Sequence, residues 1–362
     1  MKATQKLHEL GQSVWLDNIT GDLLTSGTLK RYIAEFSLSG LTSNPTIFDH
    51  AIKNSSHYDS AIRSKLNEGK SGETLFFELA IEDLAQAADL FRPIWDRTNG
   101  VDGWVSLEVS PLLAHDTAST IAAARELHTQ AKRPNLFIKI PGTREGLPAI
   151  EESIFAGVPV NVTLLFSREH YLARRRGISA RHRAAHCSRS ESRCWLRCIG
   201  LHQSLGCRRC RQGSRAYTQQ ARYRNRETNI QGSLRGARFS TLAAYLQRGG
   251  GRPQRLLWAS TGTKDPAASD VLYIKALAAP LTVNTMPEGT VKALADHGEV
   301  GEMLAADGGD AEEVLSQFAK AGVDVDALAA TLQDDGAKSF VKSWNELLGV
   351  ISAKTEVLKK AS

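Results

Sequence analysis

The stretch Asn135-Leu136-Phe137-Ile138-Lys139-Ile140-Pro141-Gly142-Thr143 is an apolar run with a lysine inside it, ended by a Pro-Gly pair. Its length, its apolar composition and the turn residues that bound it predict a buried strand. An ammonium in that setting is costly, and burial favours the neutral amine. A neutral amine is a nucleophile that condenses with a carbonyl to form a Schiff base. The stretch alone also allows a structural lysine that reaches solvent at the strand end or pairs with a carboxylate.

Strand and helix patterns alternate on both sides of this stretch. Helical patterns follow the strands that apolar runs predict at residues 14–17, 41–44, 104–109, 136–140, 158–165, 255–260 and 281–284. Repeated strand–helix units with apolar strands predict a parallel sheet covered by helices. Eight such units close into a barrel, so we expect an α/β fold of the (β/α)8 TIM barrel type, with additional helices and a disrupted strand six region. An open doubly wound sheet is the alternative, but no glycine-rich phosphate motif follows the first strand.

Five of these strands carry a polar residue at or near their C-terminal end. Side chains alternate across a strand, and each polar residue lies on the face opposite the aliphatic one. In a barrel those ends converge at one mouth, where enzymes of this fold keep their chemistry. Singly, each residue also has a structural explanation as a turn residue, a helix cap or a strand former. The five residues are Asp17, Asn44, Glu108, Lys139 and Thr163.

Composition marks the chain as an acidic protein with a basic insert. The 362 residues carry a net charge of +6, but residues 174–250 hold 18 arginines, no lysine and two acids, and the rest of the chain is at −10. All five cysteines lie in the same insert. We expect a cytoplasmic protein, because the sequence shows neither a secretory signal nor an apolar window of membrane-spanning length.

Six motifs together resemble the transaldolase family in its longer bacterial form. The resemblance covers most of residues 8–173 and 252–350, and it implies a single barrel domain over residues 1–362. It further implies transfer of dihydroxyacetone from sedoheptulose 7-phosphate or fructose 6-phosphate to glyceraldehyde 3-phosphate or erythrose 4-phosphate, a step of the pentose phosphate pathway. The motifs are Val14-Trp-Leu-Asp17, Gly40-Leu-Thr-Ser-Asn44-Pro-Thr46, Ser106-Leu-Glu108-Val109, Ile138-Lys139-Ile-Pro-Gly-Thr143, Asn161-Val-Thr163-Leu-Leu-Phe-Ser167 and Trp258-Ala-Ser260-Thr-Gly-Thr-Lys264-Asp-Pro266.

The resemblance assigns a role to each of the five polar residues. It implies that Lys139 forms the Schiff base and that Asp17 is the acid/base of carbon–carbon cleavage. It implies that Glu108, with a water held near Thr163, assists imine formation. Asn44 would orient the bound dihydroxyacetone.

Substrate binding and cofactors follow from the same resemblance. Ser260 matches a phosphate-binding position, and nearby Lys264 is a second candidate for that role. No metal or cofactor is expected, because the protonated imine is the electron sink. The expected partners are sugar phosphates, with no nucleic acid and no membrane. The alternative within this chemistry is a Schiff-base aldolase that releases free dihydroxyacetone.

Residues of about 174–250 depart from the family pattern, which there has a strand with a serine and an arginine for the substrate phosphate. Arginine and cysteine enrichment without lysine favours a segment translated in the wrong reading frame. We then expect poor folding and little activity of this chain, both restored by the frame-corrected gene. If the DNA cannot encode the family pattern in another frame, this hypothesis is wrong.

Two functional interpretations of the insert remain as alternatives. Its cysteines include a Cys207-Arg-Arg-Cys210 pair with zinc-ligand spacing, although a second close pair is missing. Its arginines could form a nucleic-acid-binding arm, although that arm would interrupt a barrel at a core strand. Either would make the chain a basic zinc-binding or nucleic-acid-binding protein on a decayed barrel. The zinc ligands would come from Cys194, Cys198, His202, Cys207 and Cys210.

Overall fold

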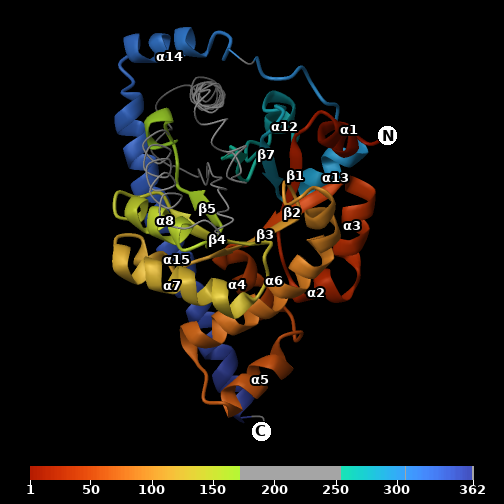
Figure 1. Ribbon diagram of the computed structural model, residues 1–362, viewed down its shortest axis with the longest axis vertical. Coiled ribbons are helices and arrows are strands. Elements are labelled where there is room, and N and C mark those ends of the chain that lie inside the picture. Colours follow the sequence, from red (N-terminus) through yellow and green to blue (C-terminus); the bar gives the residue numbers. More distant parts are fainter. Residues whose placement is uncertain (172–253, 306, 361–362) are drawn as a thin grey trace, which may run out of the picture.

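The computed structural model describes residues 1–171, 254–305 and 307–360. Its centre is a curled parallel sheet with the strand order β5-β4-β3-β2-β1-β7-β6, surrounded by helices (Figure 1). This arrangement confirms the predicted α/β class and matches the predicted barrel type. The strands are β1 (Ser13–Asp17), β2 (Leu38–Thr42), β3 (Trp104–Glu108), β4 (Leu136–Pro141), β5 (Val160–Thr163), β6 (Leu257–Trp258) and β7 (Val283–Met286).

Among the described strands, β5 and β6 stand at the two ends of this order, and the chain between them includes the basic insert. The expected disruption of the sixth strand and the candidate zinc and nucleic-acid residues therefore lie outside the described residues.

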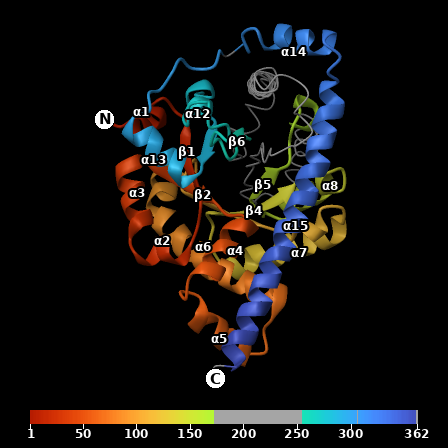
Figure 2. The same cartoon turned by 180° about the vertical axis from the view of Figure 1, so that it is seen from behind.

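Helices cover the outer face of the sheet and extend below it. The described helices are α1 (Ala3–Glu9), α2 (Gly21–Thr25), α3 (Thr28–Phe36), α4 (Pro45–Asn54), α5 (Asp59–Asn67), α6 (Gly72–Arg97), η1 (Pro111–Leu113), α7 (Thr117–Ala131), α8 (Gly146–Phe155), α12 (Leu272–Ala276), α13 (Glu288–Asp296), α14 (Ala311–Lys320) and α15 (Val325–Lys360). The longest, α15, runs from α14 past α8 and α4 to α5 (Figure 2). Within the described residues, none of these helices combines the length and apolarity needed to cross a membrane.

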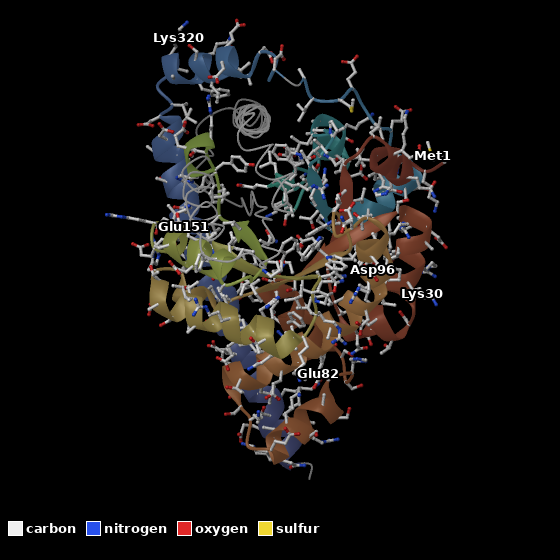
Figure 3. All side chains as sticks on the ribbon, in the orientation of Figure 1. Met1, Lys30, Glu82, Asp96, Glu151 and Lys320 are labelled. Atoms are coloured by element: carbon white, nitrogen blue, oxygen red, sulfur yellow. The ribbon has the colours of Figure 1, made fainter. Side chains whose placement is uncertain are left out.

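Many charged side chains lie on the outer surface of the helices, away from the sheet. Lys30, Glu82 and Lys320 are labelled examples, and all three are exposed (Figure 3). The strands in contrast are almost wholly buried, and every residue of β4 is. Burial of apolar strands between helices and the barrel interior supplies the main stabilisation of such a fold.

The sheet interior towards the N-terminal ends of the strands is filled by aromatic rings. Trp15, Trp104 and Phe137 are fully buried there, and the rings of Trp104 and Phe137 stack with their centroids 4.0 Å apart. Gly40 of β2 leaves the space for one of them, since a Cβ at that position would lie 2.5 Å from the indole of Trp15. The polar residues predicted for the site lie further along the strands, towards their C-terminal ends.

Several predicted strand boundaries were wrong. The second strand was predicted at 41–44 but ends at Thr42, and Asn44 instead caps α4 by accepting a hydrogen bond from the Ile47 amide at 3.1 Å. The strand predicted at 255–260 is limited to β6, because Ser260 has a φ of 49° and leaves the extended conformation. Leu281, with a φ of 61°, likewise delays the start of β7. A left-handed residue cannot continue a strand.

A buried tyrosine–aspartate pair joins the region of α2 and α5 to α6. The hydroxyl of Tyr58 donates to Asp83 at 2.6 Å and accepts from the Gly21 amide at 2.9 Å. Burial, more than any neighbouring charge, raises the pKa of Asp83 to about 6. The same burial raises the pKa of Tyr58. The Asp83 carboxyl is therefore more costly to ionise in the folded protein than in the unfolded chain.

This pair gives a prediction for the pH dependence of stability. Because the folded pKa of Asp83 lies above its unfolded value, the stability from its protonated form is fully present below the unfolded pKa and is lost as pH rises through about 6. We expect Asp83→Asn to remove this loss, which amounts to about 3 kcal/mol at neutral pH. Urea unfolding of both proteins at pH 4.5 and pH 7 measures their free energies of unfolding. If the free energies of the two proteins differ by the same amount at both pH values, the prediction is wrong.

Candidate active site

Lys139 and Glu108 form an ion pair inside the barrel. They are opposite each other in the register of β3 and β4, and Lys139 Nζ lies 3.1 Å from Glu108 Oε2. Only 5 % of Lys139 and 7 % of Glu108 are exposed. The lysine therefore does not reach solvent at the strand end; it pairs with a carboxylate at the predicted mouth.

Burial raises the pKa of Glu108, and the nearby charge of Asp17 acts in the same direction. The Lys139 ammonium opposes this rise but does not cancel it. A carboxyl that keeps its proton can act as a proton donor, and the amine group beside it is a nucleophile of the kind that attacks a carbonyl.

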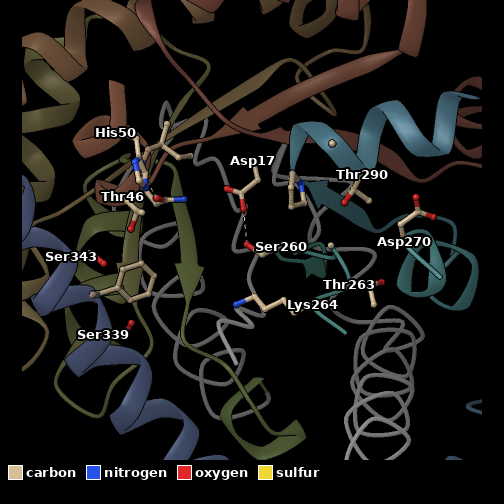
Figure 4. Close-up of a pocket in the computed structure, with 16 residues that line it drawn as sticks. Asp17, Thr46, His50, Ser260, Thr263, Lys264, Asp270, Thr290, Ser339 and Ser343 are labelled. Atoms are coloured by element: carbon tan, nitrogen blue, oxygen red, sulfur yellow. Dashed lines mark hydrogen bonds between the residues drawn. The ribbon is translucent and has the colours of Figure 1, made fainter. Parts of the chain in front are cut away.

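Asp17 ends β1 and is held by two hydroxyl groups. Thr42 donates to its Oδ1 at 2.9 Å and Ser260 donates to its Oδ2 at 2.6 Å. Figure 4 shows the contact with Ser260 as a dashed line inside the cavity. The two bonds hold the carboxylate in one orientation, and a carboxylate oxygen can accept a proton from a substrate.

Two adjoining cavities contain the predicted site residues. A small cavity of about 20 Å³ is lined by Asp17, Lys139, Thr163 and Ser260 among others. A larger one of about 620 Å³ shares Asp17 and Ser260 with it, and it is also lined by Asn44 and Lys264. The structure thus brings together all seven residues predicted for the site, Glu108 through its contact with Lys139.

Of the predicted residues, Ser260 lies differently from what its assigned role suggests, whereas Thr163 lies beside a space that suits its role. Ser260 was expected to contact a phosphate, but here its hydroxyl is directed to Asp17. Thr163 Oγ1 is buried and has no hydrogen-bond partner among the described residues. The small cavity next to Thr163 is large enough for one water molecule.

Several cavity residues were not predicted from the sequence. Thr46 and His50 of α4 and Ser339 and Ser343 of α15 line the larger cavity (Figure 4). The ring of Phe340, also on α15, lies 5.1 Å from Lys139 Nζ. No local pattern marks residues on the inner side of helices as site residues, because they share their spacing with ordinary core positions. Strand alternation, in contrast, could have found Thr42.

Within the described parts of the chain, no group of three or more histidine, cysteine, aspartate or glutamate side chains is arranged to hold a metal ion.

Comparisons with known proteins agree with this chemistry. The family described as transaldolase/fructose-6-phosphate aldolase matches residues 14–351. A transaldolase of Thiobacillus denitrificans is 41 % identical, and the match covers 97 % of this chain and 100 % of that protein. Transaldolases of Saccharopolyspora erythraea and Frankia alni are each 39 % identical, with 98 % and 96 % of both chains covered. The chain therefore belongs to the transaldolase family, and these matches support a transaldolase function for it.

Proposed function

We propose that this protein transfers a dihydroxyacetone unit from a ketose phosphate to an aldose phosphate through an imine on Lys139. One observation carries the proposal: a buried amine lies 3.1 Å from a buried carboxyl of raised pKa, beside a cavity that holds a second carboxylate. Sugar phosphates as partners and a cytoplasmic location belong to the same proposal.

Imine formation is assigned to Lys139 and Glu108. The free amine adds to the ketone carbon, and the carbinolamine then loses its hydroxyl as water. Glu108 supplies the proton for that loss, because burial keeps its carboxyl protonated at a higher pH than an exposed glutamate. The small cavity at Thr163 has room for one water molecule, and we assign the relay of this proton to a water bound there.

Carbon–carbon cleavage is assigned to Asp17. Its carboxylate takes the proton of the C4 hydroxyl while the C3–C4 bond breaks and its electron pair moves towards the protonated imine. The aldose phosphate leaves, and an enamine remains on Lys139. An aldose phosphate acceptor then reacts in the reverse sense, with Asp17 returning the proton. Asn44, at the N-cap of α4, faces the same cavity and is proposed to orient the dihydroxyacetone unit.

The larger cavity is proposed to hold the rest of the sugar phosphate. Its volume of about 620 Å³ suits a small phosphorylated sugar, and Lys264 places a cation at its wall. Ser260 shares this wall, so its hydroxyl is available both to Asp17 and to a substrate.

Reductive trapping tests the proposal directly. Fructose 6-phosphate is added to the full chain, borohydride reduces any imine, and peptide mapping by mass spectrometry locates the adduct. We expect it on the peptide that contains Lys139; an unmodified peptide in well-folded protein would refute the proposal. Measuring transfer to an acceptor against release of free dihydroxyacetone separates transfer from simple aldolase activity.

Glu108 gives a prediction about pH. Because the proton donor is protonated only below its pKa, dehydration of the carbinolamine slows as pH rises through that value, which lies above the ordinary range of glutamate. We expect Glu108→Gln to slow imine formation about 100-fold and to abolish this fall of the rate with rising pH. Stopped-flow mixing followed by borohydride quenching at a series of pH values measures both effects. If the variant's rate of imine formation still falls with rising pH in the same way, another group donates the proton.

A further inference from the structure

Helix α15 is fastened across the ends of β4 and β5. Gln333 Nε2 donates to the carbonyl of Gly142 at 3.0 Å and to that of Leu164 at 2.7 Å. One turn on, Gly336 lets the helix approach so closely that a Cβ there would lie 2.8 Å from a methyl group of Leu164. These contacts fix the position of the next turn of the helix, which carries Phe340.

Phe340 is placed against the proposed nucleophile. Its ring centroid lies 5.1 Å from Lys139 Nζ, within the range of a cation–π interaction. Only 9 % of the residue is exposed, and it packs in one cluster with Leu332 and with the chain that follows β5. The nitrogen of Lys139 is therefore flanked by two different groups, the carboxyl of Glu108 and an aromatic ring.

We propose that Phe340 is a catalytic residue whose ring stabilises the positive charge on the Lys139 nitrogen in the imine. The inference rests on the proposed function, since it requires the imine. Phe340 also lines the larger cavity, so its ring lies beside the route by which a sugar reaches the amine.

The expected effect is a longer lifetime of the imine. In hydrolysis, the oxygen of water adds to the imine carbon, the electron pair of the C=N bond moves to nitrogen, and water gives up a proton to a base such as Glu108. The nitrogen loses its positive charge in this step. A ring that attracts the cation stabilises the imine more than the transition state and so slows its loss.

Removal of the ring should therefore shorten the imine lifetime. The full chain is loaded with fructose 6-phosphate, freed of excess sugar by rapid gel filtration and quenched with borohydride at increasing times, and the Lys139 adduct is quantified by mass spectrometry. We expect Phe340→Leu, which keeps an apolar side chain of similar size, to shorten the half-life about tenfold. Site-specific replacement by phenylalanine with one, two and three ring fluorines, which weaken the negative face at nearly constant shape, should shorten it stepwise.

Leu332→Ala is the matched control. It removes packing from the same helix and the same cluster without touching the ring that contacts Lys139. We expect its imine half-life to stay within twofold of the parent protein. A similar shortening in Leu332→Ala, or an unchanged half-life across the fluorinated series, would overturn the inference while the parent adduct still supports the proposed function. A parent protein that forms no adduct would overturn both.

Discussion

Replacing Lys139 with methionine is expected to abolish the trapped imine and to lower kcat/KM by at least about 1,000-fold, because the thioether of methionine cannot form the covalent bond to the sugar carbonyl. Methionine approximates the length and the apolar stem of lysine, so the strand should keep its packing. Without the Lys139 ammonium, which opposes the rise in the Glu108 pKa, the neutral form of the Glu108 carboxyl is favoured further. Borohydride trapping and steady-state transfer assays on the same preparation measure both effects.

A second buried lysine provides the control for this experiment. Lys65 of α5 is 8 % exposed and pairs with Glu78 at 3.2 Å and Glu82 at 2.6 Å, and it does not line either cavity of the site. We expect Lys65→Met to keep the adduct on the Lys139 peptide. A stoichiometric adduct that persists in Lys139→Met would show that another amine forms the imine.

Replacing Asp17 with asparagine is expected to slow cleavage by about 100- to 10,000-fold while imine formation continues. Asparagine has nearly the same shape, but it cannot take a proton from the C4 hydroxyl. The mass of the trapped adduct distinguishes the two steps. We expect the parent protein to carry the three-carbon unit on Lys139, whereas Asp17→Asn should accumulate the intact six-carbon sugar phosphate.

Ser260→Ala is the companion variant for Asp17. It removes one of the two hydroxyl donors that hold the carboxylate but leaves the proton acceptor itself in place. Loss of one such hydrogen bond should slow cleavage by roughly tenfold, well short of the effect of Asp17→Asn. If Asp17→Asn instead accumulates the three-carbon adduct at the parent rate, another base carries out the cleavage.

The strand that contains Lys139 could be located from sequence because its signal is local. Its run is wholly buried and ends at a turn pair, and the observed β4 extends the predicted 136–140 range by only one residue. Strand β2, by contrast, was misplaced for a reason that no local pattern reveals. It contains Ser39 and Gly40, and the glycine is there because the indole of Trp15, from another strand, occupies the space of a Cβ.

The face on which each polar residue lies was a property of the sequence alone. Alternation along a strand is dictated by the backbone, so Asp17, Glu108 and Lys139 could be assigned to the barrel interior before any contact was known. Their chemistry could also be inferred from the sequence, because burial of a lysine ammonium in an apolar run costs free energy.

Only the tertiary structure decided which of these groups touch. The 3.1 Å contact of Lys139 with Glu108 depends on the register of two strands, and the bond from Ser260 to Asp17 depends on a left-handed turn after β6. The approach of Phe340 depends on how a distant helix packs over the strand ends. Periodicity along the chain reports the direction of a side chain, whereas the distance between two side chains is set by the packing of whole elements, which local backbone preference does not encode.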